Sequence, residues 1–203
     1  MRRLVNEAAA VELLRLGEVV AAATESSFGL LADARNPRAL DRLFACKPRQ
    51  SGGVGLILPT FAAWSGWVEG VPHDARLLAE AFWPGALTLA LPAQRHVDPR
   101  LCQAGTIAVR VAGACSAQRL AVASGLTLTA TSANAPRAAP ALDHASVVKD
   151  LPGAWAVYGH APGGAPSALI GFQGGAARIL RSGRITAQAL GQVVPLDSAA
   201  SSY

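Results

Sequence analysis

The 203-residue sequence predicts a single α/β domain, in which helices pack around one twisted sheet of mixed parallel and antiparallel strands. Short apolar runs of strand type alternate with helical segments along the whole chain, and glycine-rich turns separate the last strands. No internal repeat, block of like charge or long linker divides the chain. We expect one domain over residues 1–203, with a core of about 6–192 and a frayed tail over 193–203.

The first third of the chain contains two helices with clear end signals. Asn6 can cap a helix over Glu7–Leu16, and Gly17 can end it before a buried strand at Val19–Ala23. Asn36 followed by proline predicts the start of a second helix, which ends near Cys46.

The rest of the chain continues the alternation. The expected strands are Leu56–Leu58, Leu87–Leu91, Thr106–Val111, Leu126–Thr131, Ala154–Tyr158, Ser167–Phe172 and Ala177–Leu180. The expected helices begin after Thr60, after Pro72, at Ser116 and at Thr186. We interpret Phe82-Trp83-Pro84-Gly85 as core packing with a tight turn.

Composition favours a compact protein with acidic partners. Only 15% of the residues are charged and 51% are hydrophobic, which argues against disordered and fibrous classes. The net charge of +5 rests on arginine, because Lys47 and Lys149 are the only lysines. Such a charge favours partners that carry phosphate, although a compositional bias toward arginine explains it equally well.

The sequence contains no pattern typical of a metal centre or of a membrane protein. The cysteines Cys46, Cys102 and Cys115 form no Cys-x-x-Cys pair, and no histidine lies at ligand spacing from them. We therefore expect no metal site. The N-terminus has no signal-peptide pattern and no apolar run approaches the ~20 residues of a membrane span, so we expect a cytoplasmic protein.

Three polar segments lie next to expected strand or helix ends: Thr24 to Leu30, Lys47-Pro48-Arg49, and Thr131-Ser132-Ala133-Asn134. Hydroxyls, fixed positive charge and backbone amides at such ends are what a phosphate-bearing ligand requires. Each segment alone has an ordinary explanation as a turn or as charge that complements a helix dipole.

Arg110 lies within an apolar strand, where Thr106, Ala108 and Arg110 share one face. A strand-borne arginine requires an acid, a phosphate or solvent, because leaving it buried and unpaired is very unfavourable. An edge strand with a wet face remains an alternative. Ser167 and Arg181 add one hydroxyl and one guanidinium after glycine-rich turns.

Taken in order, these segments resemble the YrdC/TsaC family of threonylcarbamoyl-AMP synthases. The resemblance covers roughly Gly17 to Ile185 and rests on six motifs of the family. These are the Pro-Thr-Glu-Thr-x-Tyr-Gly-Leu-like strand end at Ala23–Leu30, Lys47-x-Arg49, the Trp83-Pro84-Gly85 turn, the Val109-Arg110 strand, Ser132-Ala133-Asn134, and Ser167 with the final Leu180-Arg181-Ser182-Gly183.

The resemblance implies a YrdC-like fold and an enzyme that joins L-threonine, bicarbonate and ATP into L-threonylcarbamoyladenylate and pyrophosphate, for N6-threonylcarbamoyladenosine formation in tRNA. It implies that Mg²⁺ enters with ATP, that tRNA binding is possible, and that other proteins of the tRNA-modification pathway are partners. Lys47 and Arg49 would be catalytic. The ATP-binding residues would be Lys47, Arg49, Thr106, Ser132, Asn134 and Arg181, and the threonine-binding residues would be Thr24, Ser26, Arg110, Thr131 and Ser167.

Several loops differ from the family pattern, chiefly residues 50–55, residues 135–140, and Ala168 where threonine is usual. Two alternatives therefore stay open. One is a non-catalytic module that binds tRNA or double-stranded RNA, and the other is a relative that acts on a different acceptor.

Overall fold

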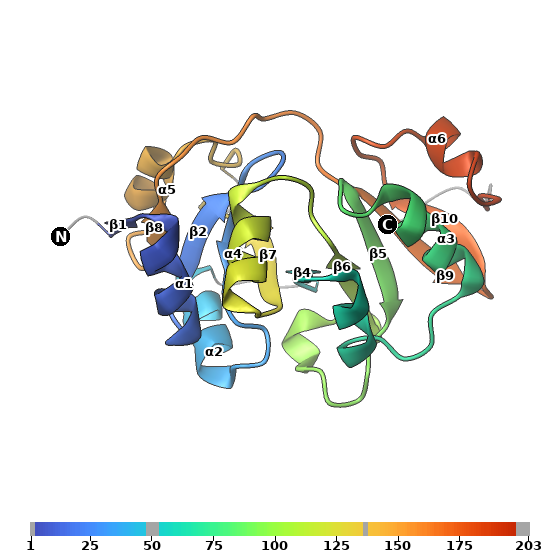
Figure 1. The fold of residues 1–203 in the computed structure, drawn as a ribbon, viewed down its shortest axis with the longest axis horizontal. Helices are drawn as coiled ribbons and strands as arrows, with labels where there is room; N and C mark the ends of the chain where they lie inside the picture. Colours follow the sequence, from blue (N-terminus) through green and yellow to red (C-terminus); the bar gives the residue numbers. More distant parts are fainter. Residues whose placement is uncertain (1–2, 48–52, 136–137, 198–203) are drawn as a thin grey trace.

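The computed structural model describes residues 3–47, 53–135 and 138–197. In these residues ten strands form one mixed sheet, with helices on both sides (Figure 1). The strands are β1 (Leu4–Val5), β2 (Val20–Ala23), β3 (Phe28–Leu31), β4 (Gly55–Ile57), β5 (Leu87–Pro92), β6 (Thr106–Arg110), β7 (Leu128–Ser132), β8 (Trp155–Val157), β9 (Ala168–Gln173) and β10 (Ala176–Arg181).

The helices are mostly short. The α-helices are α1 (Glu7–Arg15), α2 (Pro37–Cys46), α3 (His73–Phe82), α4 (Ser116–Ser124), α5 (His144–Asp150) and α6 (Ala187–Gly191), and the 3-10 helices are η1 (Phe61–Gly66) and η2 (Pro99–Leu101).

Local capping explains where these helices begin. Asn6 accepts a hydrogen bond from the Ala9 amide at 2.9 Å, and Asn36 accepts from the amides of Arg38 and Ala39, with Pro37 in the first turn. Helix α4 ends at Gly125, which has a φ of +72°. Each of these helix ends is confirmed as predicted, to within one residue.

The strand order is β1-β8-β2-β3-β7-β4-β6-β5-β9-β10. The pairs β1/β8, β8/β2, β4/β6 and β5/β9 are parallel, and the other neighbours are antiparallel. The predicted mixed sheet is therefore confirmed. Strand β6 lies between β4 and β5, so the alternative of an edge strand for Arg110 is wrong.

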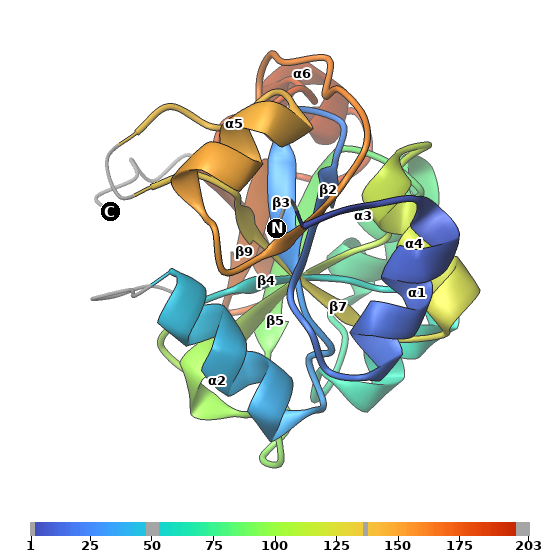
Figure 2. The same ribbon diagram turned by 90° about the vertical axis from the view of Figure 1, so that its left-hand side faces the viewer.

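The core is divided between the two sides of the sheet. Helices α1 and α4 contact each other, and their residues Leu14 and Leu120 are fully buried together with Val20 and Leu31 of the sheet. A larger apolar cluster takes in α2 and α3 and the inward residues of β5 and β6. Figure 2 shows α1 and α4 on one side of the strands and α2 on the other.

The packing also confirms the structural role expected of Trp83. The Trp83 side chain is buried, and its indole N–H donates to the Leu87 carbonyl at 2.8 Å. It packs edge-on against Trp64 and Phe61.

Four parts of the fold differ from the expectation. Strand β1, strand β3 and helix α5 were not predicted. The segment 193–197 is not frayed: Val194 is buried, and the Asp197 amide donates to the Ala177 carbonyl at 2.8 Å. Packing against β10 orders this segment, whereas its short sequence alone carries no such signal. Residues 198–203 of the expected tail lie outside the described residues.

Candidate active site

The sheet encloses one large cavity of about 840 Å³, a size typical of small-molecule sites. Its lining comes from the β2–β3 turn, from strands β3, β4, β5, β6, β7, β9 and β10, and from the loop before β6. Eight of the predicted site residues line it: Thr24, Ser26, Thr106, Arg110, Thr131, Ser132, Ser167 and Arg181. The fold thus brings together side chains from five segments spread over 158 positions of the chain (Thr24 to Arg181).

Lys47 reaches the cavity wall through Ser132. The Lys47 ammonium, at the end of α2, donates to the Ser132 carbonyl at 2.6 Å, the Ser132 hydroxyl at 3.0 Å and the Asn134 amide oxygen at 2.8 Å. Asn134 is itself held, because its amide nitrogen donates to the carbonyls of Ala135 and Ala138. Two of the predicted motifs therefore form a single network, which fixes a positive charge beside the cavity.

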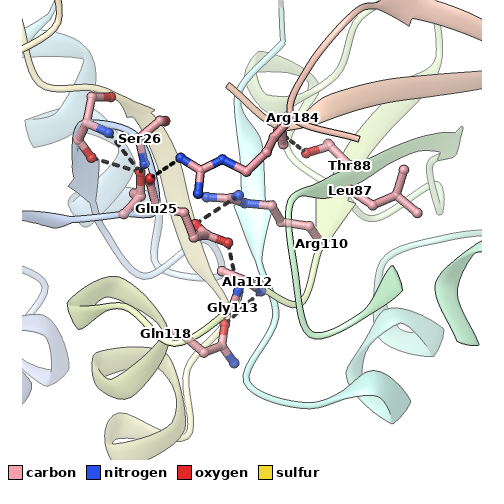
Figure 3. A network of polar contacts seen from close by, with 12 residues as sticks. Glu25, Ser26, Leu87, Thr88, Arg110, Ala112, Gly113, Gln118 and Arg184 are labelled. Carbon is pink, nitrogen blue, oxygen red and sulfur yellow. Dashed lines mark hydrogen bonds and ion pairs between the residues drawn. The ribbon is translucent and has the colours of Figure 1, made fainter. Parts of the chain in front are cut away.

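Arg110 is largely buried on the cavity side of β6 and is paired with an acid (Figure 3). Its Nη1 lies 3.2 Å from Glu25 Oε2, and the two side chains are only 11% and 14% exposed. The other Glu25 oxygen accepts a hydrogen bond from the Gly113 amide at 2.7 Å. Of the partners that the sequence left open for Arg110, an acid, a phosphate or solvent, the structure supplies an acid: Glu25, in the turn after β2.

Ser167 and Arg181 contact each other at the far end of the chain. One guanidinium nitrogen of Arg181 donates to the carbonyl of Ser167 at 3.0 Å and to its hydroxyl at 3.2 Å. The same hydroxyl lies 2.8 Å from that of Thr88 on β5. Burial, followed by the nearby charge of Arg110, lowers the pKa of Arg181, although a guanidinium remains protonated at neutral pH.

Two predicted residues use their hydroxyls within their own turns. The Thr24 hydroxyl donates to the Ser27 carbonyl at 2.8 Å and accepts from the amides of Ser26 and Ser27, which shapes the turn after β2. The Thr106 hydroxyl donates to the Gln103 carbonyl at 2.8 Å. Arg49 lies outside the described residues, so its position is not part of this geometry.

Three functional candidates were not singled out from the sequence: Glu25, Arg178 and Arg184. Arg178 lines the cavity from β10. Arg184 donates to the carbonyls of Glu25, at 2.9 Å, and Gly163, at 3.2 Å. Glu25 lies inside the motif at Ala23–Leu30 that carries the family resemblance. A signal for Arg178 was also present, because the two-residue period of a strand places it on the same face of β10 as Leu180.

The charge of the cavity suits an anion. Arg110, Arg178 and Arg181 line it, and no aspartate or glutamate of the described residues is among the lining side chains.

Within the described ranges no group of three or more His, Cys, Asp or Glu side chains could hold a metal ion. No helix in this part of the chain is long and apolar enough to cross a membrane.

Comparison with known proteins decides the family. The Sua5/YciO/YrdC family model, described as "Telomere recombination", matches residues 12–183. The chain belongs to the Sua5/YciO/YrdC family. This match confirms the resemblance stated from the six motifs.

Two relatives of this Sua5/YciO/YrdC chain carry the name threonylcarbamoyl-AMP synthase. The protein of Thiobacillus denitrificans is 38% identical over 130 residues, which cover 63% of this chain and 69% of the relative. The protein of Bacillus subtilis is 34% identical over 194 residues, which cover 92% of this chain and 56% of the relative. The match thus spans little more than half of the Bacillus protein.

A solved structure of the family superposes closely on this chain. Pyrococcus abyssi Sua5, complexed with L-threonine, has a TM-score of 0.87 and 25% sequence identity. The superposition covers 97% of this chain and 63% of the Sua5 chain. The fold of the Sua5/YciO/YrdC family, predicted from the motifs, is therefore present over nearly the whole chain.

Proposed function

We propose that this protein is a threonylcarbamoyl-AMP synthase, which condenses L-threonine, bicarbonate and ATP into L-threonylcarbamoyladenylate and pyrophosphate. The observation that carries the proposal is the convergence of the separate family motifs on one cationic cavity. The names of the relatives and the threonine held by the Pyrococcus abyssi structure support the same activity.

Roles follow from chemistry and position. Lys47, with Ser132 and Asn134, is suited to hold ATP phosphates, because three contacts fix its ammonium beside the cavity. We assign Thr106 and Arg181 to the nucleotide as well, and Arg49 by its motif alone. Arg110 is suited to a carboxylate, and Thr24, Ser26, Thr131 and Ser167 are hydrogen-bonding groups for threonine or its carbamate.

The reaction needs positioning and positive charge more than a side-chain nucleophile. The threonine amine and bicarbonate form a carbamate with loss of water, a carbamate oxygen then bonds to the α-phosphorus of ATP, and pyrophosphate leaves. Both reactants of the second step are anions, so cations that hold them in line lower the barrier. Mg²⁺ would enter bound to the ATP phosphates as part of the substrate.

Pyrophosphate release tests the proposal directly. We expect release that requires ATP, L-threonine and bicarbonate together, with the adenylate product identified by mass spectrometry. Nucleotide binding without pyrophosphate formation, with all three substrates present, would contradict the enzyme. A product formed with another amine and not with threonine would instead identify a relative with a different acceptor.

The same preparation tests the RNA-binding alternative. A non-catalytic module would bind tRNA with an affinity that falls steeply with salt and is indifferent to ATP. The transfer of the threonylcarbamoyl group to tRNA, the partner proteins and the cytoplasmic location stay predictions. The enzyme is favoured over this module because the uncharged Ser132 and Ser167 line the cavity and Asn134 holds Lys47 beside it, whereas a phosphate backbone would need only cations.

A further inference from the structure

Glu25 is held in place from both of its ends (Figure 3). Its backbone carbonyl accepts a hydrogen bond from Arg184, in the loop after β10, at 2.9 Å. Its carboxylate accepts one from the Gly113 amide at 2.7 Å and pairs with Arg110 at 3.2 Å. Two segments that are far from Glu25 in sequence, residues 110–113 and the loop at Arg184, thus fix this one acid, and its side chain is only 14% exposed.

The pairing leaves most of the Arg110 guanidinium available. The contact with Glu25 Oε2 is an ion pair without an aligned hydrogen bond, since that oxygen is buried and has no hydrogen-bond partner in the described part of the chain. A guanidinium carries five N–H donors. Because Arg110 lines the cavity, its remaining donors can serve a ligand.

Arg181 offers a contrast at the same cavity. Its hydrogen bonds within the described residues go to the uncharged Ser167, and it forms no ion pair there. Burial lowers the pKa of Arg181, and the charge of Arg110 lies near enough to add to this effect. Two close arginines with no acid between them would form a clamp for a polyphosphate.

We infer that Glu25 is a positioning and specificity residue, which orients Arg110 and offsets its charge so that this end of the cavity takes a single carboxylate instead of a polyphosphate. The inference deepens the proposed function and rests on it for the identity of the carboxylate, L-threonine. A cavity that binds two different anions requires ends that differ in charge, because either anion would otherwise bind at both ends.

Glu25→Gln tests this role with little change of shape. The amide oxygen can still accept from the Gly113 N–H, whereas the negative charge beside Arg110 is lost. We expect the affinity for tripolyphosphate, measured by calorimetry, to rise about tenfold and the affinity for L-threonine to fall about tenfold. Tripolyphosphate should also become a competitor of threonine. Glu69→Gln, at an exposed position, is the matched loss of one negative charge and should change neither affinity.

A double variant distinguishes an effect of the Glu25 charge on anion binding from an effect of the substitution on folding. Glu25→Gln with Arg110→Gln replaces a neutral pair by another neutral pair, so tripolyphosphate affinity should return to within about twofold of the wild type, while threonine binding is lost. An unchanged tripolyphosphate affinity in Glu25→Gln would overturn the inference, as would a double variant that binds tripolyphosphate as tightly as Glu25→Gln does. Thermal unfolding of each variant verifies that it is folded.

The outcomes also separate this inference from the proposed function. A wild-type protein that binds tripolyphosphate but no threonine would contradict the synthase, and the comparison of tripolyphosphate affinities would still decide the role of Glu25. A wild-type protein that binds threonine and releases pyrophosphate, alongside a Glu25→Gln variant with unaltered affinities, would leave the synthase standing and refute the role of Glu25.

Discussion

The ammonium of Lys47 and the amide oxygen of Asn134 lie 2.8 Å apart, although 87 positions separate the two residues in the sequence. Lys47 lies at the end of α2 and Asn134 follows β7, so the two side chains come into contact only when the sheet is formed. Asn134 is buried and its amide nitrogen is engaged by two carbonyls, which leaves its oxygen no freedom to turn away from Lys47. The lysine charge is therefore fixed before a ligand arrives.

Lys47→Ala should reduce pyrophosphate release about 100-fold or more, because it removes a preorganised charge from the proposed phosphate site. The measurement is the initial rate with saturating ATP, threonine and bicarbonate. Lys149→Ala is the matched control, since Lys149 is the only other lysine and lies exposed on α5. Equal rates for the two variants would refute the assignment of Lys47.

Ser167→Ala should raise the KM for threonine about tenfold and change the KM for ATP less. The Ser167 hydroxyl contacts both Arg181 and Thr88, so its removal leaves two polar groups at the cavity without that partner. Steady-state kinetics with each substrate varied separately gives both constants. Ser65→Ala removes an exposed hydroxyl that donates to the Ala62 carbonyl, and it should be neutral. A larger effect on ATP than on threonine would place Ser167 in the nucleotide site instead.

Elements with local end signals could be predicted from the sequence, and elements that depend on distant partners could not. Helices α2 and α4 were predicted because Asn36, Pro37 and Gly125 mark their ends whatever the rest of the chain does. Strand β3 was missed, because Phe28–Leu31 follows a polar turn directly and is buried on both faces, without the alternation that identifies a strand. Strand β1 has two residues and exists through its pairing with β8.

The candidate site shows the same division. Lys47, Arg110, Ser132 and Ser167 could be selected, because their motifs resemble a family in which the order of short segments is informative. Glu25 could not be selected on physical grounds, since its partner Arg110 lies 85 positions away and nothing local indicates that the two meet. From the sequence alone, an acid at the end of a strand is interpreted as an ordinary turn residue, because only the folded sheet places β6 beside it.

Gly183→Ala should lower both the melting temperature and the affinity for substrates. A methyl group on Gly183 would overlap with the backbone of Ser167 and Ala168, so either the loop after β10 or the start of β9 must move, and Arg181 moves with it. Differential scanning fluorimetry and threonine calorimetry are the measurements.

The control for this change is Gly191→Ala, at the end of α6. A methyl group there meets only the end of the Leu196 side chain at 4.0 Å, so the variant should melt within a few degrees of the wild type. If both alanines were equally well tolerated, the close approach of residues 167 and 183 would not be required for the site.

Glu7→Gln should destabilise the protein at neutral pH and have less effect in acid. Glu7, in the first turn of α1, accepts from Arg119 at 2.6 Å and from the Ser116 hydroxyl at 2.7 Å, both on α4. The hydrogen bond from Arg119 is the main reason that the pKa of Glu7 lies below its usual 4.5. Because the folded state lowers this pKa, the stabilisation is present above pH 4.5 and is lost as the pH falls through the lower value.

The size of the effect should be modest, about 0.5–1 kcal/mol at pH 7, because the two side chains are 37% and 61% exposed and solvent screens the pair. Urea unfolding at pH 7 and at pH 3 measures it, and we expect the difference between variant and wild type to shrink at the lower pH. Glu12→Gln, on the same helix, removes a pair with Arg15 that is more exposed and should cost less. A loss of stability that is equal at both pH values would show that Glu7 acts through packing and not through its charge.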